Sequence, residues 1–393
     1  MAGIGVGRRV VLPVITCAAL ALGCAMAGCG APHQAGSRAE TLVSKQSAGS
    51  PRTATAAMTA TGQPRYFADI VLASGSVAGT GPLQIRSSAT GALVPRQPSV
   101  YALAIVAYGN GSRLMIARQA GDGCTSRLYR AALSEDGRLG RLSRVGPVVR
   151  GLVTSVAADS SGSLIGYFAG ACSKSASGYL AVLSTRTGHT RRWTGVAVYG
   201  SAGTLATGTA LSMSATGRLL AFTGAGSRAT AQRVWVLRTS AAAGPIARRV
   251  RTVISKPAAG PALSSVVLSP DGKSFYLCTV ATKGAVSAHR TVTQTAVITA
   301  RRTSDGTSTS TLAKLTATGV TFLGQGFGCP MAMTPNGRYL LAPYRLHYGA
   351  STTVPPLVSA AVIAISGPAR RTISFQLPGS AGMSVADGIT AAW

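Results

Sequence analysis

Residues 265–277 read SVVLSPDGKSFYL, which is an apolar run, a tight turn at Pro270-Asp271-Gly272, and a second apolar run. Asp-Gly turns join antiparallel strands, because glycine adopts the positive φ that a tight hairpin needs. The same unit recurs four more times along the chain. Its turn glycines are Gly111, Gly162, Gly217, Gly272 and Gly337, which lie 51, 55, 55 and 65 residues apart. The chain therefore repeats a structural unit of about fifty residues.

A second set of turns falls between these and follows apolar strands such as 179–183. These turns lie at 88–91, 134–137, 185–188, 239–244, 303–306 and 365–368. Two hairpins per repeat make a four-stranded antiparallel sheet, which is the blade of a β-propeller. No long run shows the 3.6-residue period of a helix.

The ends of the chain complement each other. The first repeat starts in mid-blade, at 66–72 and 83–87, and the chain ends in a lone apolar strand, 388–393. We expect this last strand, with Trp393, to join the N-terminal strands and close the ring, which removes its open edges. The predicted fold is an all-β, six-bladed β-propeller spanning 64–393, with seven blades as the alternative.

The turns Ser269-Pro-Asp-Gly-Lys and Thr334-Pro-Asn-Gly-Arg resemble the turn signature of WD40-like and TolB-type propellers. The chain also has a lipobox-like Met26-Ala27-Gly28-Cys29, an Ala/Ser/Thr-rich stretch at 29–63 and Thr-Gly turns. This layout resembles WD40-like lipoproteins of actinobacteria. The resemblance spans most of 65–393. It implies a binding module whose turn residues are structural. The shared fold by itself does not carry function.

Residues 1–28 have the layout of an export signal. Arg8 and Arg9 precede a stretch free of charge, and Met26-Ala27-Gly28 precedes Cys29 as in a bacterial lipobox. The prediction is a lipoprotein in which Cys29 carries the lipid. An uncleaved membrane anchor and an ordinary secretory signal remain as alternatives. All three place the folded part outside the cytoplasm, and we expect it tethered to the outer face of the bacterial cytoplasmic membrane.

Residues 29–63 are rich in Ala, Ser and Thr and show no apolar period, which predicts a flexible, disordered linker. The four cysteines beyond the leader and Cys29 are Cys124, Cys172, Cys278 and Cys329. An even number in an exported chain favours disulfides. Cys124 and Cys172 occupy the same loop in consecutive repeats, so we expect them to pair. Cys278 and Cys329 either pair or stay as buried thiols.

No catalytic constellation stands out. The expected innermost strands, the first of which is 101–105, carry small and apolar residues with a few hydroxyls. Most carboxylates fall in or beside turns, where Asp bonds the backbone. No nucleophile elbow is followed by an acid and a histidine. The four histidines and the absence of a Cys-x-x-Cys spacing argue against zinc. We expect no enzyme activity, no metal and no cofactor.

The chain has 38 Lys plus Arg against 9 Asp plus Glu, for a net charge of +29. Arginines gather on the predicted outer strands of the blades, at Arg138, Arg141, Arg191, Arg192, Arg248, Arg249, Arg370 and Arg371. Charge there protects exposed edges from aggregation, and it also attracts an anionic lipid or wall polymer. Nucleic acid is not expected, because no aromatic residues interleave with the basic ones.

The predicted function is that of an exported, membrane-tethered, monomeric propeller that binds a protein or an anionic envelope polymer without catalysis. The alternative is a propeller hydrolase or lyase acting on a small sugar-derived or lactone substrate. Acids or histidines around the channel would favour the enzyme, and a channel without them would favour the binding module.

Overall fold

The computed structural model describes residues 63–71, 80–121, 124–170, 178–196, 210–225, 231–257, 260–283, 291–320, 329–347, 357–366, 370–376 and 389–392. These stretches form β-sheet with one short 3-10 helix, η2 (Ile246–Arg248). Within them no helix has the length and apolar character to cross a membrane. The predicted leader, Cys29 and all of the predicted linker except Gln63 lie outside the described residues.

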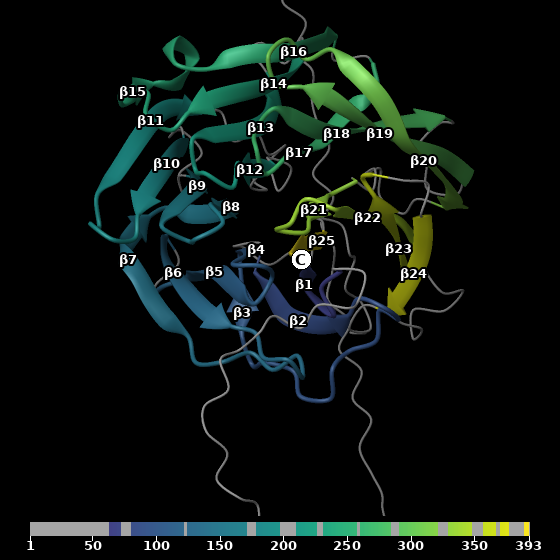
Figure 1. Ribbon diagram of the computed structural model, residues 1–393, viewed down its shortest axis with the longest axis horizontal. Helices are drawn as coiled ribbons and strands as arrows, with labels where there is room; N and C mark the ends of the chain where they lie inside the picture. Colours follow the sequence, from purple (N-terminus) through teal and green to yellow (C-terminus); the bar gives the residue numbers. More distant parts are fainter. Residues whose placement is uncertain are drawn as a thin grey trace, which may run out of the picture. The chain divides into compact units, whose positions relative to one another are not determined.

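Six sheets are arranged around a central axis as the blades of a propeller, which confirms the predicted fold (Figure 1). The region around this axis, bordered by the innermost strands, is called the channel below. From the channel outward, blade 1 is β25 (Ile389–Ala392), β1 (Tyr66–Val71), β2 (Gly81–Ser87) and β3 (Tyr101–Ala102). Blade 2 is β4 (Ala104–Tyr108), β5 (Arg113–Gln119), β6 (Thr125–Ala132) and β7 (Ser143–Arg150). Blade 3 is β8 (Leu152–Ala158), β9 (Leu164–Gly170), β10 (Gly178–Ser184), β11 (Thr190–Val196) and β15 (Gly244–Pro245).

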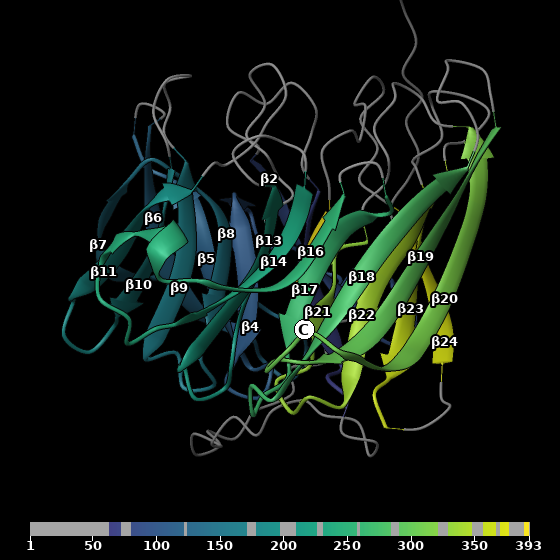
Figure 2. The ribbon, with the colours of Figure 1, turned by 90° about the horizontal axis from the view of Figure 1, so that it is seen from above.

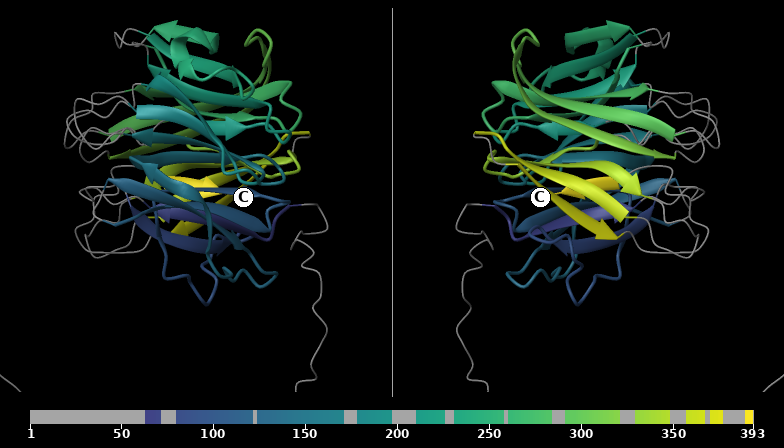
Figure 3. Two further views of the ribbon diagram at one scale, coloured as in Figure 1. Left: turned by 90° about the vertical axis from the view of Figure 1, so that its left-hand side faces the viewer. Right: turned by 90° about the vertical axis from the view of Figure 1, so that its right-hand side faces the viewer.

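Blade 4 is β12 (Leu211–Met213), β13 (Leu219–Ala225), β14 (Ala231–Arg238) and β16 (Arg251–Pro257). Blade 5 is β17 (Ala262–Leu268), β18 (Ser274–Lys283), β19 (Thr291–Arg302) and β20 (Ser308–Val320). Blade 6 is β21 (Ala332–Met333), β22 (Tyr339–His347), β23 (Leu357–Ala364) and β24 (Arg370–Gln376). Seen edge-on, the strands run between the two faces of the ring (Figures 2 and 3).

The turn at Pro270-Asp271-Gly272 has the geometry that its residues predict. Gly272 has a φ of 70°. The carboxylate of Asp271 accepts hydrogen bonds from Ser269 Oγ at 2.6 Å and from the Lys273 amide at 3.0 Å. Each such turn is also tied to the end of the third strand of its own blade; Thr303 N, for example, donates to Lys273 O at 2.9 Å. The two kinds of turn therefore lie on the same face of the ring.

The turns of successive blades are joined by backbone hydrogen bonds. Gly109 N donates to Ser160 O, Ser160 N to Ala215 O, and Ala215 N to Pro270 O, at 2.9–3.0 Å. The series ends at Pro270, because proline has no amide hydrogen to donate. Its ring occupies the space beside Gly337, where a Cβ would lie 2.6 Å from Pro270 Cγ. The backbone hydrogen bonds therefore join the turns of blades 2 to 5, and the Pro270 ring brings the turn of blade 6 against that of blade 5.

The C-terminal strand closes the ring as predicted. In blade 1, β25 is the innermost strand and pairs antiparallel with β1, so that Ala392 lies opposite Ala68 and Ile389 opposite Val71. Blade 1 is thus built from both ends of the folded chain, and β25 supplies its innermost strand. Trp393 lies outside the described residues.

Two details of the strands differ from expectation. Residues 101–105 were expected as one innermost strand, but the segment divides at Leu103: Tyr101–Ala102 pairs with β2 of blade 1, and Ala104 begins blade 2. Only Leu103 lies between β3 and β4, so the chain passes from the outer edge of blade 1 to the inner edge of blade 2 within one residue. The segment after Thr239 is longer than a hairpin turn, and it carries β15 across to the outer edge of blade 3.

Apolar side chains fill the spaces between neighbouring blades. Buried clusters join blades 1 and 2, 2 and 3, 3 and 4, 4 and 5, and 5 and 6. Burial of this kind is the main favourable term in folding. The interface between blades 6 and 1 differs, because it also carries buried charge.

Candidate functional site

The channel offers hydroxyls that already have backbone partners. The amide of Leu268 donates to Ser212 Oγ at 2.9 Å, which links the innermost strands of blades 5 and 4. The amide of Cys329 donates to Ser264 Oγ, and Ser265 Oγ donates to Cys329 O, both at 2.6 Å, which links blades 6 and 5. These serines therefore connect blades, as hydrogen-bonded buried polar groups do in other proteins.

Most carboxylates of the described chain stabilise turns. The hydrogen bond from Ser269 lowers the pKa of Asp271, and hydrogen bonds from Thr307 lower that of Asp305. None of the described carboxylates or histidines lies on an innermost strand, and none of them forms a cluster that would hold a metal ion. Within the described residues, the channel lacks the paired acids that general acid–base catalysis uses.

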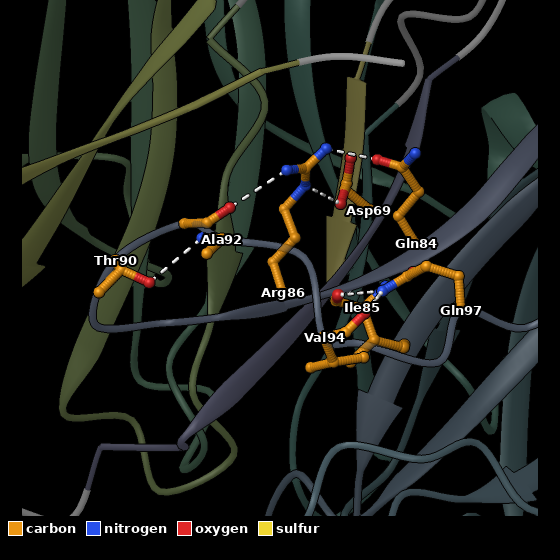
Figure 4. A network of polar contacts seen from close by, with 9 residues as sticks. Asp69, Gln84, Ile85, Arg86, Thr90, Ala92, Val94 and Gln97 are labelled. Atoms are coloured by element: carbon orange, nitrogen blue, oxygen red, sulfur yellow. Dashed lines mark hydrogen bonds and ion pairs between the residues drawn. The ribbon is translucent and has the colours of Figure 1, made fainter. Parts of the chain in front are cut away.

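Of the two buried carboxylates among the described residues, Asp159 bonds its own turn and Asp69 forms an ion pair. Asp69 on β1 is fully buried, and its Oδ1 accepts a hydrogen bond from Arg86 Nε at 2.8 Å (Figure 4). Arg86 also donates to Gly91 O at 3.1 Å and to the side-chain oxygen of Gln84. Burial raises the pKa of Asp69 to about 6, against the opposing effect of Arg86. The second oxygen, Oδ2, has no hydrogen-bond partner.

The sheet register places this ion pair at the ring closure. Ala68, Ile70, Leu83 and Ile85 pack with blade 2. The alternate residues Phe67, Asp69, Gln84 and Arg86 therefore point to the other side of blade 1, toward blade 6. Arg371 on β24 of blade 6 donates to Ser88 O at 2.7 Å across this interface. The buried charge thus lies where the last blade meets the first, away from the channel.

Of the two possibilities left open for Cys278 and Cys329, the structure has the disulfide. It joins the second strand of blade 5 to the start of blade 6, across 51 residues of chain. Cys124 is also disulfide-bonded. Its expected partner, Cys172, lies outside the described residues, so the Cys124–Cys172 pair stays a prediction.

The eight arginines expected on the outer strands do not form one surface. Arg191 and Arg192 lie on β11, and Arg370 and Arg371 on β24, which are fourth strands as expected. The expectation was wrong for the other four, which are exposed but precede their fourth strands. Arg138 and Arg141 lie in the segment before β7, and Arg248 and Arg249 lie in or beside η2, before β16. In both places a connection longer than a tight hairpin separates the third and fourth strands.

Three outer-strand arginines act as straps between blades. In blades 3, 4 and 6, an arginine donates to the backbone carbonyl that begins the third–fourth turn of the next blade. The pairs are Arg191 with Thr239, Arg251 with Thr303, and Arg371 with Ser88. Guanidinium groups suit this task, because they present several donors and stay charged. These side chains are therefore engaged in structure.

A second group of arginines lies on blade 2 and remains accessible. Arg118 on β5 is directly opposite Arg127 on β6, and Tyr129 on β6 is directly opposite Arg144 on β7. The guanidinium of Arg118 lies over the ring of Tyr129, 5.6 Å from its centroid, and Arg118 Nε donates to the carbonyl of Tyr101 at 3.2 Å. We call Arg118, Arg127, Tyr129 and Arg144 the arginine–tyrosine surface. Tyr101 is not part of it, because Val100 and Ala102 pack toward blade 2 and the side chain between them points to the other face of blade 1.

Arg118, Arg127 and Tyr129 did not stand out in the sequence as a site. The available signal was density: residues 104–150 hold eight arginines against three carboxylates. The spacing alone does not show which arginines share a sheet face, since that depends on the register of β5, β6 and β7.

No protein-family model and no curated protein sequence matches the chain. Solved structures share its fold at low sequence identity. The periplasmic gluconolactonase PpgL of Pseudomonas aeruginosa is 13% identical, with a TM-score of 0.44 over 81% of this chain and 98% of that one. A putative 6-phosphogluconolactonase from Bacteroides uniformis is 16% identical, with a TM-score of 0.41 over 78% and 82%. A nidogen/laminin complex gives 10% identity and a TM-score of 0.45 over 84% and 98%. At this distance the likeness concerns the fold alone.

Proposed function

We propose that this propeller is an exported, membrane-tethered binding module that holds an anionic polymer of the cell envelope. The observation that carries the proposal is the imbalance of accessible charge. Only two ion pairs occur in the described part of the chain, Arg86–Asp69 and Arg138–Asp136. Most accessible arginines therefore face solvent without a carboxylate, and such a surface attracts polyanions.

The tether is the part of the proposal that rests on the leader. Cys29 follows a lipobox-like Met26-Ala27-Gly28, and the linker 29–63 gives the propeller reach from the membrane. Replacing Cys29 with alanine in the full chain tests it. We expect the variant to move from the membrane fraction into the soluble fraction. Retention in the membrane would contradict lipid attachment and favour the uncleaved anchor.

Affinity capture of the tagged full chain from native membranes, at low and at high salt, tests the binding function. We expect an acidic polymer to be captured at low salt and released at high salt, because screening weakens contacts between exposed charges. Capture of nothing at either salt concentration would contradict the proposal. If a protein stays bound at high salt and no polymer is captured, the partner is a protein and not a polymer.

The enzyme alternative gains no support from the described channel. A lactone hydrolase or lyase would need acids or histidines there, and the innermost strands present hydroxyls that bond neighbouring blades instead.

A further inference from the structure

The six blades share an equivalent position on the face of the ring that carries the turns, called the turn face here. It is the residue immediately before the second strand of each blade. Its carbonyl accepts a hydrogen bond of 2.8–3.0 Å from the backbone amide that follows the third strand of the same blade. In blade 5, for example, Lys273 O accepts from Thr303 N. From blade 1 to blade 6 the position is held by Arg65, Ser112, Ser163, Arg218, Lys273 and Arg338.

The charge at this position changes around the ring. Blades 2 and 3 have serine, whereas the consecutive blades 4, 5, 6 and 1 have a lysine or an arginine. All four cations are exposed. Within the described residues, none of them forms an ion pair or a side-chain hydrogen bond. We call Arg218, Lys273, Arg338 and Arg65 the cationic arc.

Few acids oppose the cationic arc. Among the described residues of these four blades, the exposed carboxylates are Asp271 and Asp305, both in turns of blade 5. Two further exposed arginines, Arg238 and Arg302, end the third strands of blades 4 and 5 on the same face. The other described carboxylates of the turn face belong to blades 2 and 3, where the equivalent position is serine, and are Glu135, Asp136 and Asp159.

The chain enters the propeller at one end of the arc. Arg65 directly precedes β1, and Pro64 before it is buried and accepts a hydrogen bond from Ser88 Oγ through its carbonyl. The predicted lipid site, Cys29, is separated from this point by the predicted linker 29–63. A flexible linker of that length reaches roughly 30 Å. The membrane is therefore the anionic surface that the turn face meets at the highest effective concentration.

The arrangement of the arc also suits a planar ligand. The blades repeat around one axis, so equivalent residues stand at similar heights and similar distances from that axis (Figure 1). A bilayer presents phosphate groups across a whole plane and can contact four such cations together. Each basic residue near an anionic lipid surface adds to the attraction, which falls off within a Debye length.

We propose that the cationic arc docks the turn face on anionic phospholipid of the membrane to which the chain is tethered. The opposite face, which carries the connections between second and third strands, is then directed away from the membrane. This inference rests on the tether of the proposed function, and it adds a membrane contact made by the propeller itself. An acidic polymer is the competing occupant of the arc, and the experiment includes it.

Two lysines report the orientation of the ring. Lys273 belongs to the arc, and Lys283 ends β18 at the opposite face; both are exposed. The full chain is reconstituted in vesicles of phosphatidylcholine alone or of phosphatidylcholine mixed with phosphatidylglycerol. We expect both kinds of vesicle to hold the protein through its N-terminal region. Mass spectrometry then follows the acylation of the two amines by a water-soluble reagent.

We expect phosphatidylglycerol to slow the acylation of Lys273 by on the order of tenfold and to leave that of Lys283 unchanged. High salt should abolish this protection, because it screens exposed charges. The site variant combines Arg65→Gln, Arg218→Gln and Arg338→Gln and keeps Lys273 as the reporter. It should dock on the order of a hundredfold more weakly and lose the protection, because each cation contributes about fivefold.

The control variant removes the same charge from the half of the ring that faces away from the turns. It combines Arg127→Gln, Arg150→Gln and Lys256→Gln, at positions near the other ends of their strands. A strand of seven residues spans roughly 20 Å, which exceeds the Debye length, so docking should weaken less than about threefold. Circular dichroism and thermal unfolding show whether each variant is folded.

Four results would overturn the inference. Acylation of Lys273 that is the same on both kinds of vesicle would show that the arc does not dock. Equal protection of Lys283 would mean that the ring has no fixed orientation. Equal losses in the site and control variants would assign the binding to net charge. Stronger protection of Lys273 by soluble polygalacturonate than by phosphatidylglycerol would assign the arc to an acidic polymer.

These results leave the proposed function in place, because the protein stays on the vesicles and can still capture a polymer. Absence of the protein from both kinds of vesicle would instead contradict the tether, which is part of the proposed function itself.

Discussion

Arg86 Nε lies 2.8 Å from Asp69 Oδ1, and both residues are almost completely buried between the first and the last blade. A buried ion pair adds little net stability, because the cost of removing two charges from water offsets most of their attraction. Its effect here is selectivity. A ring closed against the wrong partner strand or in a shifted register would leave one of these charges buried alone, which is strongly unfavourable.

Breaking this pair from one side should destabilise the protein far more than breaking the exposed one. We expect Arg86→Leu to lower the free energy of unfolding by about 3–5 kcal/mol, because Asp69 is left buried without a partner. Asp136→Asn, at the exposed pair with Arg138, should change it by less than about 1 kcal/mol. Urea unfolding measures both, and similar values for the two variants would contradict the role of burial.

The pair should also make stability depend on pH. The pKa of Asp69 is raised to about 6 in the folded protein, above its ordinary value of 3.8. The folded state therefore holds this proton more tightly than the unfolded state. The stability it contributes is fully present below pH 3.8 and is lost as the pH rises through 6, by on the order of 2–3 kcal/mol.

The measurement is urea unfolding of the wild type and of Asp69→Asn at several pH values between 4 and 7. We expect the wild type to lose stability relative to the variant across this interval. The carboxylates with lowered pKa, Asp271 and Asp305, act in the opposite direction and below pH 3.8, so they do not interfere. Parallel curves for the two proteins would show that Asp69 does not titrate in this range.

The sequence was sufficient for the repeat, because turn chemistry is local. Gly272 and Asp271 need only their neighbours to make a tight hairpin, and the same holds at each repeat. The arginine–tyrosine surface depends on which residues of neighbouring strands lie opposite each other, and such residues are not neighbours in the sequence. That Arg118 lies opposite Arg127 is set by the register of β5 on β6. Neither Asp69 nor Arg86 shows from sequence that the other is its partner, since 17 residues separate them.

The disulfide between Cys278 and Cys329 should stabilise the contact between blades 5 and 6. It closes a loop with a sequence separation of 51 residues, and loops of this size stabilise a fold by about 3–4 kcal/mol through the unfolded chain. We expect Cys278→Ala with Cys329→Ala to lower the melting temperature by several degrees. The double variant isolates this bond, because reducing agents also act on the disulfide of Cys124. An unchanged melting temperature would contradict the prediction.

The arginine straps should stabilise the protein, whereas an exposed arginine such as Arg249 should contribute little. Arg251 on β16 donates to the carbonyls of Thr303 and Ser304 in the next blade, whereas Arg249 is exposed and makes no side-chain bond among the described residues. We expect Arg251→Met to lower the free energy of unfolding by about 1–2 kcal/mol and Arg249→Met by less than about 0.5 kcal/mol. Equal values would show that the straps are incidental.

Removing the last strand should open the ring. Without residues 389–393, β1 loses the partner that Ile389–Ala392 provides and presents an unpaired edge beside the channel. Unpaired edges pair with other chains, so we expect a lower melting temperature and concentration-dependent oligomers in light scattering after gel filtration. A synthetic peptide of residues 385–393 should restore the monomer and the melting temperature by strand addition, and a scrambled peptide should not. A truncated protein that stays monomeric with an unchanged melting temperature would show that blade 1 is stable without the C-terminal strand.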